Sequence, residues 1–362
     1  MGSNEMFKID GYEISENNSP YIIAEISANH NGKIENAFKI IDMARRAGAN
    51  AVKMQTYTPD TITLKSTKPD FQIKEGLWAG TSLYELYEKA YTPWDWHKEL
   101  FDYANAQDIS IFSTPFDCSA IEFLERLDTP AYKIASFECI DLPLIREAAS
   151  TGKPLIISTG MADQREIDDA VNTALKHGSG ALILLHCISG YPAPADNYNL
   201  HTIKDMKNRF GVDVGLSDHT LDNTTAIAAV ALGAVMVEKH VTLDRNGGGP
   251  DDSFSLEEED LRDLCTSTKI AWQALGKINY ERTEAEKGNV QFRRSLYFVN
   301  SMKRGDIITE KDIRSVRPGY GMAPKYYDSI LGLQVSRDIV AHTPVNHGDV
   351  IFPSNGLGSV AS

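Results

Sequence analysis

The sequence of 362 residues contains only four cysteines, and no two of them form a C-x-x-C pair. Scattered cysteines argue against a disulfide framework or a zinc finger and suit a reducing compartment. The chain also lacks an apolar run near the ~20 residues that a membrane-spanning helix needs, and its amino terminus has no basic-then-apolar signal pattern. We therefore expect a cytoplasmic protein with no membrane partner.

Positive charge is also scarce, because 36 Lys and Arg residues face 50 Asp and Glu residues, for a net charge of −14. Nucleic acid and anionic membrane surfaces require a basic face, so we expect no nucleic-acid partner. An anionic substrate would have to be held locally by a few lysines, hydroxyls and backbone N–H groups.

A buried strand followed by an amphipathic helix recurs along the first 280 residues. Eight such units predict an α/β fold, a TIM (β/α)8 barrel. A doubly wound open sheet is the alternative, but no G-x-G-x-x-G follows the first strand, and the count of eight is complete. The expected strands cover residues 21–27, 51–55, 109–113, 131–135, 154–158, 181–186, 214–217 and 235–240.

The segments outside this repeat divide the chain. Residues 7–15 alternate like a short strand pair, which we expect to close one end of the barrel. The longest connection, residues 57–92, follows the second strand and is typical of an active-site lid. After residue 291 short strands and turns replace long helices. We expect a barrel with its amino-terminal hairpin at 1–281, a linker at 282–291 and a small β-rich domain at 292–362.

Two histidines end neighbouring expected strands. His219 follows the seventh strand and His240 ends the eighth, so both should lie at one mouth of the barrel, close enough to share a divalent metal. The alternative is that each histidine bonds to backbone, as lone histidines more often do. The paired placement favours the metal.

Polar residues end every expected strand, and a complete ring of them at the carboxyl ends points to a functional face. Lys53 and Lys133, with neighbouring hydroxyls, could hold a phosphate and a carboxylate. A metal could polarise a carbonyl, and Glu25 could act as general base or orient a water. Together they predict attack by a small phosphorylated anion on an aldehyde. The hydroxyls are those of Ser113, Thr114, Ser136, Ser158, Thr159 and Ser217, and Gln55 ends the same strand as Lys53.

Ten motifs stand out along the chain: AEISANHNG, AVKMQTYTPDT, LYELYEKAYTPWDWH, FSTPFD, AYKIASFE, KPLIISTGMA, YPAP, VGLSDHT, EKHVTLDR and RRSLY. They resemble the sialic acid synthase family, most closely its pseudaminic acid branch. The resemblance covers nearly the whole chain and includes a carboxyl-terminal antifreeze-like (SAF) domain. It implies that phosphoenolpyruvate condenses with an amino-sugar to give a nine-carbon nonulosonic acid and phosphate, with a divalent cation.

The resemblance also implies roles for individual residues. His219 and His240 match the metal ligands, for Mn²⁺ above all, with Mg²⁺ or Co²⁺ as alternatives. Glu25 matches the catalytic glutamate, and Lys53 and Lys133 bind phosphoenolpyruvate. The family forms a homodimer in which the SAF domain of one subunit reaches the active site of the other. Further substrate-binding candidates are Gln55, Thr114, Ser136, Glu138, Ser158, Ser189, Tyr191, Ser217, Asp251 and, from the partner subunit, Arg317; Ser189 stands where sialic acid synthases carry asparagine.

The branch resemblance implies the sugar 2,4-diacetamido-2,4,6-trideoxy-β-L-altropyranose, with Phe71 and Trp78 of the lid available to line an apolar pocket. The alternatives are an N-acetylneuraminate or legionaminate synthase, which run the same reaction on another amino-sugar. A Schiff-base aldolase with Lys53 or Lys133 as nucleophile is a further alternative. A module binding ice or polysaccharide through residues 294–352 would leave the polar strand ends without a role.

Overall fold

The computed structural model describes residues 7–178 and 181–353. The chain forms two compact units that divide between Gly276 and Lys277. The segment expected to be a linker groups with the second unit and includes helix α11 (Glu284–Lys287) and the start of the 3-10 helix η5 (Val290–Phe292). Each unit is described by itself.

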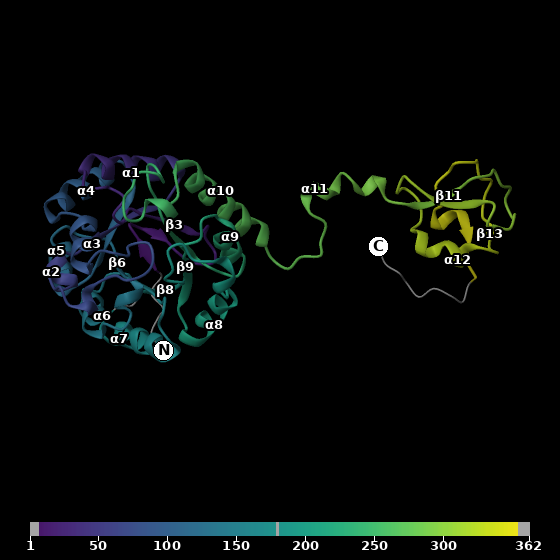
Figure 1. Cartoon of the computed structure of the whole chain (residues 1–362). Coiled ribbons are helices and arrows are strands. Elements are labelled where there is room, and N and C mark those ends of the chain that lie inside the picture. Colours follow the sequence, from purple (N-terminus) through teal and green to yellow (C-terminus); the bar gives the residue numbers. More distant parts are fainter. Residues whose placement is uncertain (1–6, 179–180, 354–362) are drawn as a thin grey trace. The chain divides into compact units, whose positions relative to one another are not determined.

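The first unit is a closed barrel of eight parallel strands, as the repeat predicts, and helices surround the strands (Figure 1). The barrel closes where β10 pairs with β3, which sets His240 beside Glu25. The strands are β3 (Tyr21–Glu25), β4 (Ala51–Thr56), β5 (Ser110–Pro115), β6 (Tyr132–Ile134), β7 (Leu155–Ser158), β8 (Leu182–Cys187), β9 (Asp213–Ser217) and β10 (Met236–His240). The surrounding helices are α1 (Ile34–Ala47), α4 (Trp94–Ala106), α5 (Cys118–Glu125), α6 (Leu142–Ser150), α7 (Gln164–Lys176), α8 (His201–Phe210), α9 (Thr224–Ala231) and α10 (Glu258–Leu275).

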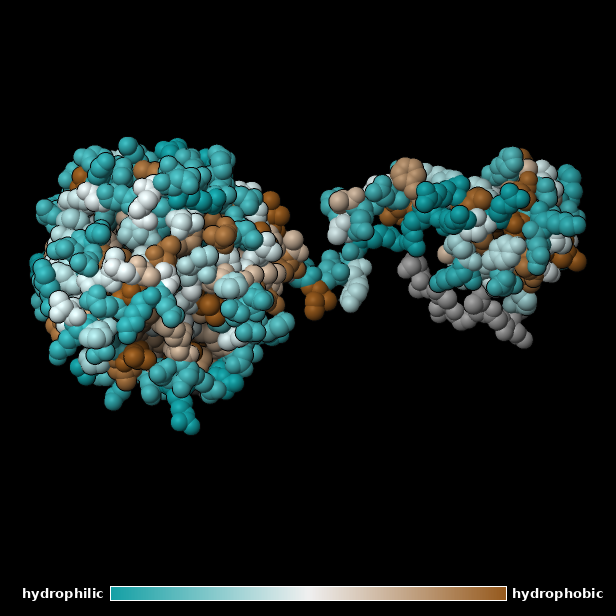
Figure 2. All heavy atoms as spheres, in the orientation of Figure 1, coloured by the Kyte–Doolittle hydropathy of each residue, from teal (hydrophilic) through white to brown (hydrophobic). Residues whose placement is uncertain are grey.

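The helices begin at capping residues and bury their apolar faces, as their sequences favour. In α7, Asp163 caps the first turn by accepting the N–H groups of Arg165 and Glu166, so it satisfies backbone donors that have no partner inside the helix. Ile167 and Val171, four residues apart, lie on the buried face. On the face that Figure 2 shows, hydrophilic residues predominate at the periphery of the barrel unit.

The side chains inside the barrel change from apolar to polar along each strand. Near the amino ends, inward-facing Ile23, Ala51 and Met236 form a buried apolar cluster. Successive side chains on a strand alternate between faces, so the next inward position is two residues further on. Glu25, Lys53 and Glu238 occupy these next positions. The floor of the barrel is therefore apolar and its carboxyl-end mouth is polar.

A short hairpin, β1 (Lys8–Ile9) with β2 (Tyr12–Glu13), adds Phe7, Ile9 and Ile14 to the apolar cluster of the floor. The predicted closure of one end of the barrel is therefore confirmed.

The loop after β9 is fixed from outside the barrel by Lys239. This side chain is 1% exposed. Its ammonium donates to Asp218 Oδ2 and to the carbonyls of Thr220 and Asp222, each at 2.8 Å. A buried charge is tolerated where it is paired and hydrogen-bonded in this way. The network holds the loop that carries His219.

The long connection after β4 contains α2 (Pro59–Ile62), the 3-10 helix η1 (Pro69–Phe71) and α3 (Leu83–Ala90). It is tied to the β10–α10 loop, because the indole N–H of Trp78 donates to the carbonyl of Pro250 at 3.0 Å. Short 3-10 helices lie in the other loops of this unit: η2 (Ser136–Glu138), η3 (Ala195–Asn197) and η4 (Asp252–Phe254).

The second unit is a small β-rich domain around its own core, which includes Leu296, Phe298 and Val345. Its elements are β11 (Ser295–Phe298), β12 (Ile313–Val316), η6 (Pro324–Tyr326), α12 (Tyr327–Ile330), β13 (Gln334–Val335), η7 (His347–Asp349) and β14 (Val350–Ile351). Within residues 7–178 and 181–353, no helix is both long and apolar enough to cross a membrane.

Candidate active site

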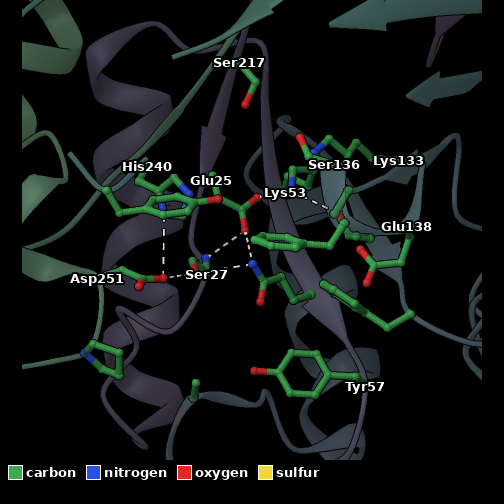
Figure 3. Close-up of a pocket in the computed structure, with 18 of the residues that line it drawn as sticks. Glu25, Ser27, Lys53, Tyr57, Lys133, Ser136, Glu138, Ser217, His240 and Asp251 are labelled. Carbon is green, nitrogen blue, oxygen red and sulfur yellow. Dashed lines mark hydrogen bonds and ion pairs between the residues drawn. The ribbon is translucent and has the colours of Figure 1, made fainter. Parts of the chain in front are cut away.

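A cavity of roughly 290 Å³ opens at the carboxyl ends of the barrel strands. The barrel supplies its polar floor, where the side chains of Glu25 and Lys53 point toward each other (Figure 3). The lid supplies an apolar wall. Twelve of the residues predicted from the sequence line it: Glu25, Lys53, Gln55, Thr114, Lys133, Ser136, Glu138, Tyr191, Ser217, His219, His240 and Asp251.

Two lysines and two glutamates form a buried cluster on the cavity floor. Lys53 Nζ pairs with Glu25 Oε2 and lies 3.7 Å from Glu238 Oε1, and it donates to Thr114 Oγ1 at 3.0 Å. Lys133 Nζ lies 3.2 Å from the same Glu238 oxygen. Burial alone would lower the pKa of Lys53, but Glu238 and Glu25 outweigh it and raise that pKa. Lys53 is therefore a cation at neutral pH.

The two glutamates differ in their protonation. Burial raises the pKa of Glu25, although Lys53 opposes that shift. Burial would also raise the pKa of Glu238, but Lys133 and Lys53 outweigh it and hold that pKa below its usual value. Two neighbouring carboxyls with pKa values pushed apart can take separate roles. Glu238 suits a fixed negative charge, and Glu25 suits proton transfer.

Glu25 is held in one orientation from the side opposite Lys53. Its Oε1 accepts the backbone N–H of Ser27 at 3.1 Å and the amide of Gln55 at 3.2 Å. These two hydrogen bonds to Oε1 fix the orientation of the Glu25 carboxyl. A general base that is fixed in this way stays within reach of the group whose proton it takes.

The two predicted metal ligands lie together, with 5.5 Å between the ring centroids of His219 and His240. His219 Nδ1–H donates to the carbonyl of Ile188 at 2.8 Å, so Nε2 carries the lone pair when the ring is neutral. Burial would lower the pKa of His219, but the bond to Cys187 and the Ile188 carbonyl outweigh it and raise that pKa. His240 Nδ1 is buried and has no hydrogen-bond partner among the described residues. Burial, with the neighbouring His219, lowers the pKa of His240 well below its usual value, so this imidazole is neutral.

These donors fit a metal with two protein ligands. Among the residues that the structure describes, no group of three or more His, Cys, Asp or Glu side chains is arranged to hold an ion. Asp251 Oδ2 is 3.7 Å from His240 Nδ1. The remaining coordination positions would fall to substrate or water.

Glu138 faces the cavity with one carboxyl oxygen buried and unpartnered within the described part of the chain. Burial raises its pKa to about 7, with Lys133 opposing the shift. A carboxyl that can be protonated near neutral pH can either donate to or accept from a substrate hydroxyl or amide.

Five predicted residues do not line the cavity. The hydroxyls of Ser113 and Thr159 donate to the backbone carbonyls of Met54 and Leu185 instead. Ser158 is 1% exposed and follows inward-facing Ile156 by two residues, but it is not one of the residues that line the cavity. Ser189 lies beside Gly160, where an added Cβ would collide with the hydroxyls of Ser189 and Ser136. Arg317 belongs to the second unit, where it lines a cleft with Arg293 and Arg294.

Several cavity residues escaped the sequence reasoning. Glu238 belongs to the ring of polar strand ends, but the sequence reasoning gives it no role in the site, although it precedes His240 by two positions on one strand. The lid residues could not be chosen in this way, because the sequence of a loop does not indicate which of its side chains face the cavity. The residues missed are Ser27, Tyr57, Ile62, Leu86, Tyr87, Ala90, Phe116, Ala135, Phe137, Cys187, Glu238 and Pro250; Trp78 lines the cavity as expected, whereas Phe71 is not one of the lining residues.

Residues 40–280 match the NeuB family, and residues 293–351 match the SAF domain. The chain belongs to the NeuB family. Among NeuB family relatives, it is 44% identical over 88% of its length to a pseudaminic acid synthase of Campylobacter jejuni, covering 93% of that protein. It is 41% identical over 91% of its length to the pseudaminic acid synthase of Helicobacter pylori, covering 98% of that protein. An N,N'-diacetyllegionaminic acid synthase of Campylobacter jejuni is 37% identical over 86% of this chain and 94% of its own length.

A solved NeuB family structure has the same architecture. The N-acetylneuraminic acid (sialic acid) synthetase of Leptospira borgpetersenii, in complex with citrate, is 31% identical with a TM-score of 0.70. The likeness covers 79% of this chain and 95% of that one.

Proposed function

We propose that this enzyme condenses phosphoenolpyruvate, 2,4-diacetamido-2,4,6-trideoxy-β-L-altropyranose and water to pseudaminic acid and phosphate. The observation that carries the proposal is the identity of 41–44% to three pseudaminic acid synthases over most of the chain. The cavity supports it, because it sets two lysines beside two histidines and an apolar wall. The second candidate is a legionaminate synthase, which the identity of 37% to such an enzyme favours.

We further propose that His219 and His240 hold a divalent cation, with Mn²⁺ first and Mg²⁺ or Co²⁺ as alternatives. When bound there, the cation would polarise the carbonyl of the open-chain sugar. The free lone pair of His219 Nε2 and the unpartnered His240 Nδ1 support the assignment.

The residues of the cavity floor bind phosphoenolpyruvate and place it against the aldehyde. Lys53 and Lys133 hold the phosphate and carboxylate of phosphoenolpyruvate, assisted by the hydroxyls of Thr114, Ser136 and Ser217. Held in this way, C3 of the enol lies against the aldehyde carbon, and the π electrons of the enol form the new C–C bond. The aldehyde oxygen becomes an alkoxide, and the proton that Glu25 takes from water in the next step finally neutralises it. C2 of the former enol now carries a positive charge. The ionised carboxylate of Glu238 lies close to it and stabilises that charge.

Glu25 completes the reaction. It orients a water and takes its proton as the oxygen bonds to C2, which a carboxylate with a raised pKa can do near neutral pH. The tetrahedral product then breaks its C2–O bond to the phosphoryl group. Phosphate leaves and takes the proton of the C2 hydroxyl, so C2 becomes the ketone of the nonulosonic acid. The lysines stabilise the negative charge on the departing phosphate throughout.

The apolar wall predicts the sugar preference. Ile62, Trp78, Leu86 and Ala90 line one side of the cavity and suit a 6-deoxy methyl group. An apolar pocket rejects an extra hydroxyl by only about 100-fold, whereas hydrogen bonds to the second acetamido group can add more. We expect kcat/KM for the diacetamido-trideoxyaltrose to exceed that for N-acetylmannosamine by more than about 100-fold.

Mass spectrometry of the products from a panel of amino-sugars, with kcat/KM measured for each, tests this preference. A higher kcat/KM for N-acetylmannosamine or for the legionaminate precursor would overturn the choice of sugar. Failure to release phosphate with any of them would overturn the condensation itself.

We also propose a homodimer in which the SAF domain of one subunit brings Arg317 to the other subunit's barrel. Charge supports this: residues 1–276 carry 24 Lys and Arg against 41 Asp and Glu, whereas residues 277–362 carry 12 against 9. The loops at the mouth also expose apolar side chains, among them Phe137, Met161 and Leu221 at 58%, 61% and 57%. Exposed apolar patches mark interaction sites.

Subunit mixing tests the shared site. An Arg317→Ala chain mixed with a Lys53→Met chain should regain about one quarter of wild-type activity, because half of the dimers are mixed and each has one intact mouth. Mixing Lys53→Met with Lys133→Met is the matched control and should regain none, since both lesions lie in the barrel. A monomer in solution, or no recovery despite exchange, would contradict the arrangement.

A further inference from the structure

Ser27 lies two residues after the end of β3, between two carboxylates of the cavity (Figure 3). Its backbone N–H donates to Glu25 Oε1 at 3.1 Å. Its hydroxyl donates to Asp251 Oδ2, on a loop 224 residues further along the chain. The side chain is 3% exposed, so water does not compete for these bonds. One residue thus links the carboxylate that faces the lysines to the carboxylate beside His240.

The backbone of Ser27 makes this double contact feasible. Its φ is +48°, in the left-handed region that residues other than glycine adopt at an energetic cost. In this conformation the N–H is directed toward Glu25 while the hydroxyl reaches Asp251. Strain of this kind persists where surrounding structure fixes it, and it concentrates at functional sites. A glycine would fit the backbone with less strain but would lack the hydroxyl.

Asp251 depends on this turn for its position. Its carboxylate accepts from the Ser27 hydroxyl and from the backbone N–H of Ala28. It also lies 3.7 Å from His240 Nδ1. Removing the hydroxyl would leave the carboxylate with one fewer donor and free to rotate toward the histidine. The Ser27 hydroxyl therefore sets where Asp251 lies relative to the sugar side of the cavity.

We propose that Ser27 is a positioning residue for the amino-sugar, acting through Asp251 and Glu25. The inference rests on the proposed condensation. In the described parts of the chain, the bonds of Ser27 go to Glu25, Gln55 and Asp251 and not to Lys133 or the hydroxyls beside it. Toward the phosphoenolpyruvate side, Ser27 is connected among these described residues only through its backbone N–H, which holds Glu25 beside Lys53. A substitution of the side chain keeps that N–H, so it should leave the phosphoenolpyruvate side unchanged.

Steady-state kinetics of Ser27→Ala and Ser27→Gly test the inference. Both should lower kcat/KM for the sugar by about 10-fold to 100-fold, since misplacing a positioning contact by about 1 Å has effects of this size. KM for phosphoenolpyruvate should change by less than about twofold. Both variants keep the N–H bond to Glu25 and lose the hydroxyl, but Ser27→Gly also relieves the backbone, so its Tm should exceed that of Ser27→Ala.

Asp108→Gly is the matched control. Asp108 also has a positive φ, +58°, but it is exposed and precedes β5, at the amino end of the strand. It should gain stability with unchanged kinetics. Wild-type kinetics in Ser27→Gly would overturn the inference, as would an equal rise of KM for both substrates in the two Ser27 variants. An inactive wild type would instead reject the proposed condensation.

Discussion

Replacing Lys53 or Lys133 with methionine should lower kcat/KM for phosphoenolpyruvate by roughly 30-fold to several thousand-fold. Each substitution removes a cation that the cavity floor offers to the substrate's phosphate and carboxylate. Truncating one partner of a buried, hydrogen-bonded charge pair costs about 2–5 kcal/mol, and each 1.4 kcal/mol is a factor of ten. The loss should appear in phosphate release measured at several phosphoenolpyruvate concentrations.

The same substitutions also remove a lysine from the glutamates: Lys53→Met removes the partner of Glu25, and Lys133→Met leaves Glu238 with Lys53 alone. Lys53→Met removes the cation that opposes the upward pKa shift of Glu25, so that pKa rises further. A base with a raised pKa becomes available only at higher pH, so the acidic limb of the kcat profile should move to higher pH. Circular dichroism would check that the barrel remains folded.

Lys98→Met is the control for these lysine variants. Lys98 pairs with Asp102 one turn along α4, and its side chain is 73% exposed. Such surface pairs contribute little, so activity and stability should stay close to wild type. Unchanged kcat/KM in both Lys53→Met and Lys133→Met would contradict the role given to the cavity floor.

Changing His219 or His240 to alanine should abolish condensation and weaken Mn²⁺ binding by at least about 100-fold. Losing only the outer partner of a ligating histidine already costs about 10-fold to 100-fold in affinity, so losing a ligand should cost more. Isothermal titration with Mn²⁺ alone measures this without relying on activity. The fold should persist, because both side chains lie at strand ends rather than in the apolar floor.

His201→Ala is the matched control for the histidine variants, because His201 is exposed at the start of α8. It should bind Mn²⁺ as the wild type does. If His219→Ala and His240→Ala also bind Mn²⁺ normally and stay active, the two rings have a structural role and the cation does not bind between them.

The barrel could be predicted from the sequence because its repeat is local. Each strand is apolar and each helix amphipathic at its own period, so the eight units can be recognised one at a time. The polar residues at the strand ends follow from the same pattern, since the carboxyl ends of parallel strands meet at one mouth. Lys53, Lys133 and both histidines were therefore within reach of sequence reasoning.

Which strand-end residues face inward was harder to predict. His186 and Cys187 both end β8, and the sequence favours the histidine as the chemical group. Alternation from inward-facing Leu185 directs Cys187 into the cavity, whereas His186 bonds to the carbonyl of Tyr198 outside it. The face of a strand is fixed by its register in the closed barrel, which one strand's sequence does not specify.

The sequence by itself determined the barrel, the small second domain, the family and most of the charged groups of the cavity. Only the tertiary structure decided the contacts between distant segments. Ser27 and Asp251 meet across 224 residues, and the indole of Trp78 reaches Pro250. Such contacts depend on how loops of irregular conformation cross the mouth of the barrel. Strands and helices can be predicted from the periodicity of their apolar residues, and loops have no such periodicity. Which loop residues face the cavity is therefore decided only when the folded barrel brings the ends of each loop together.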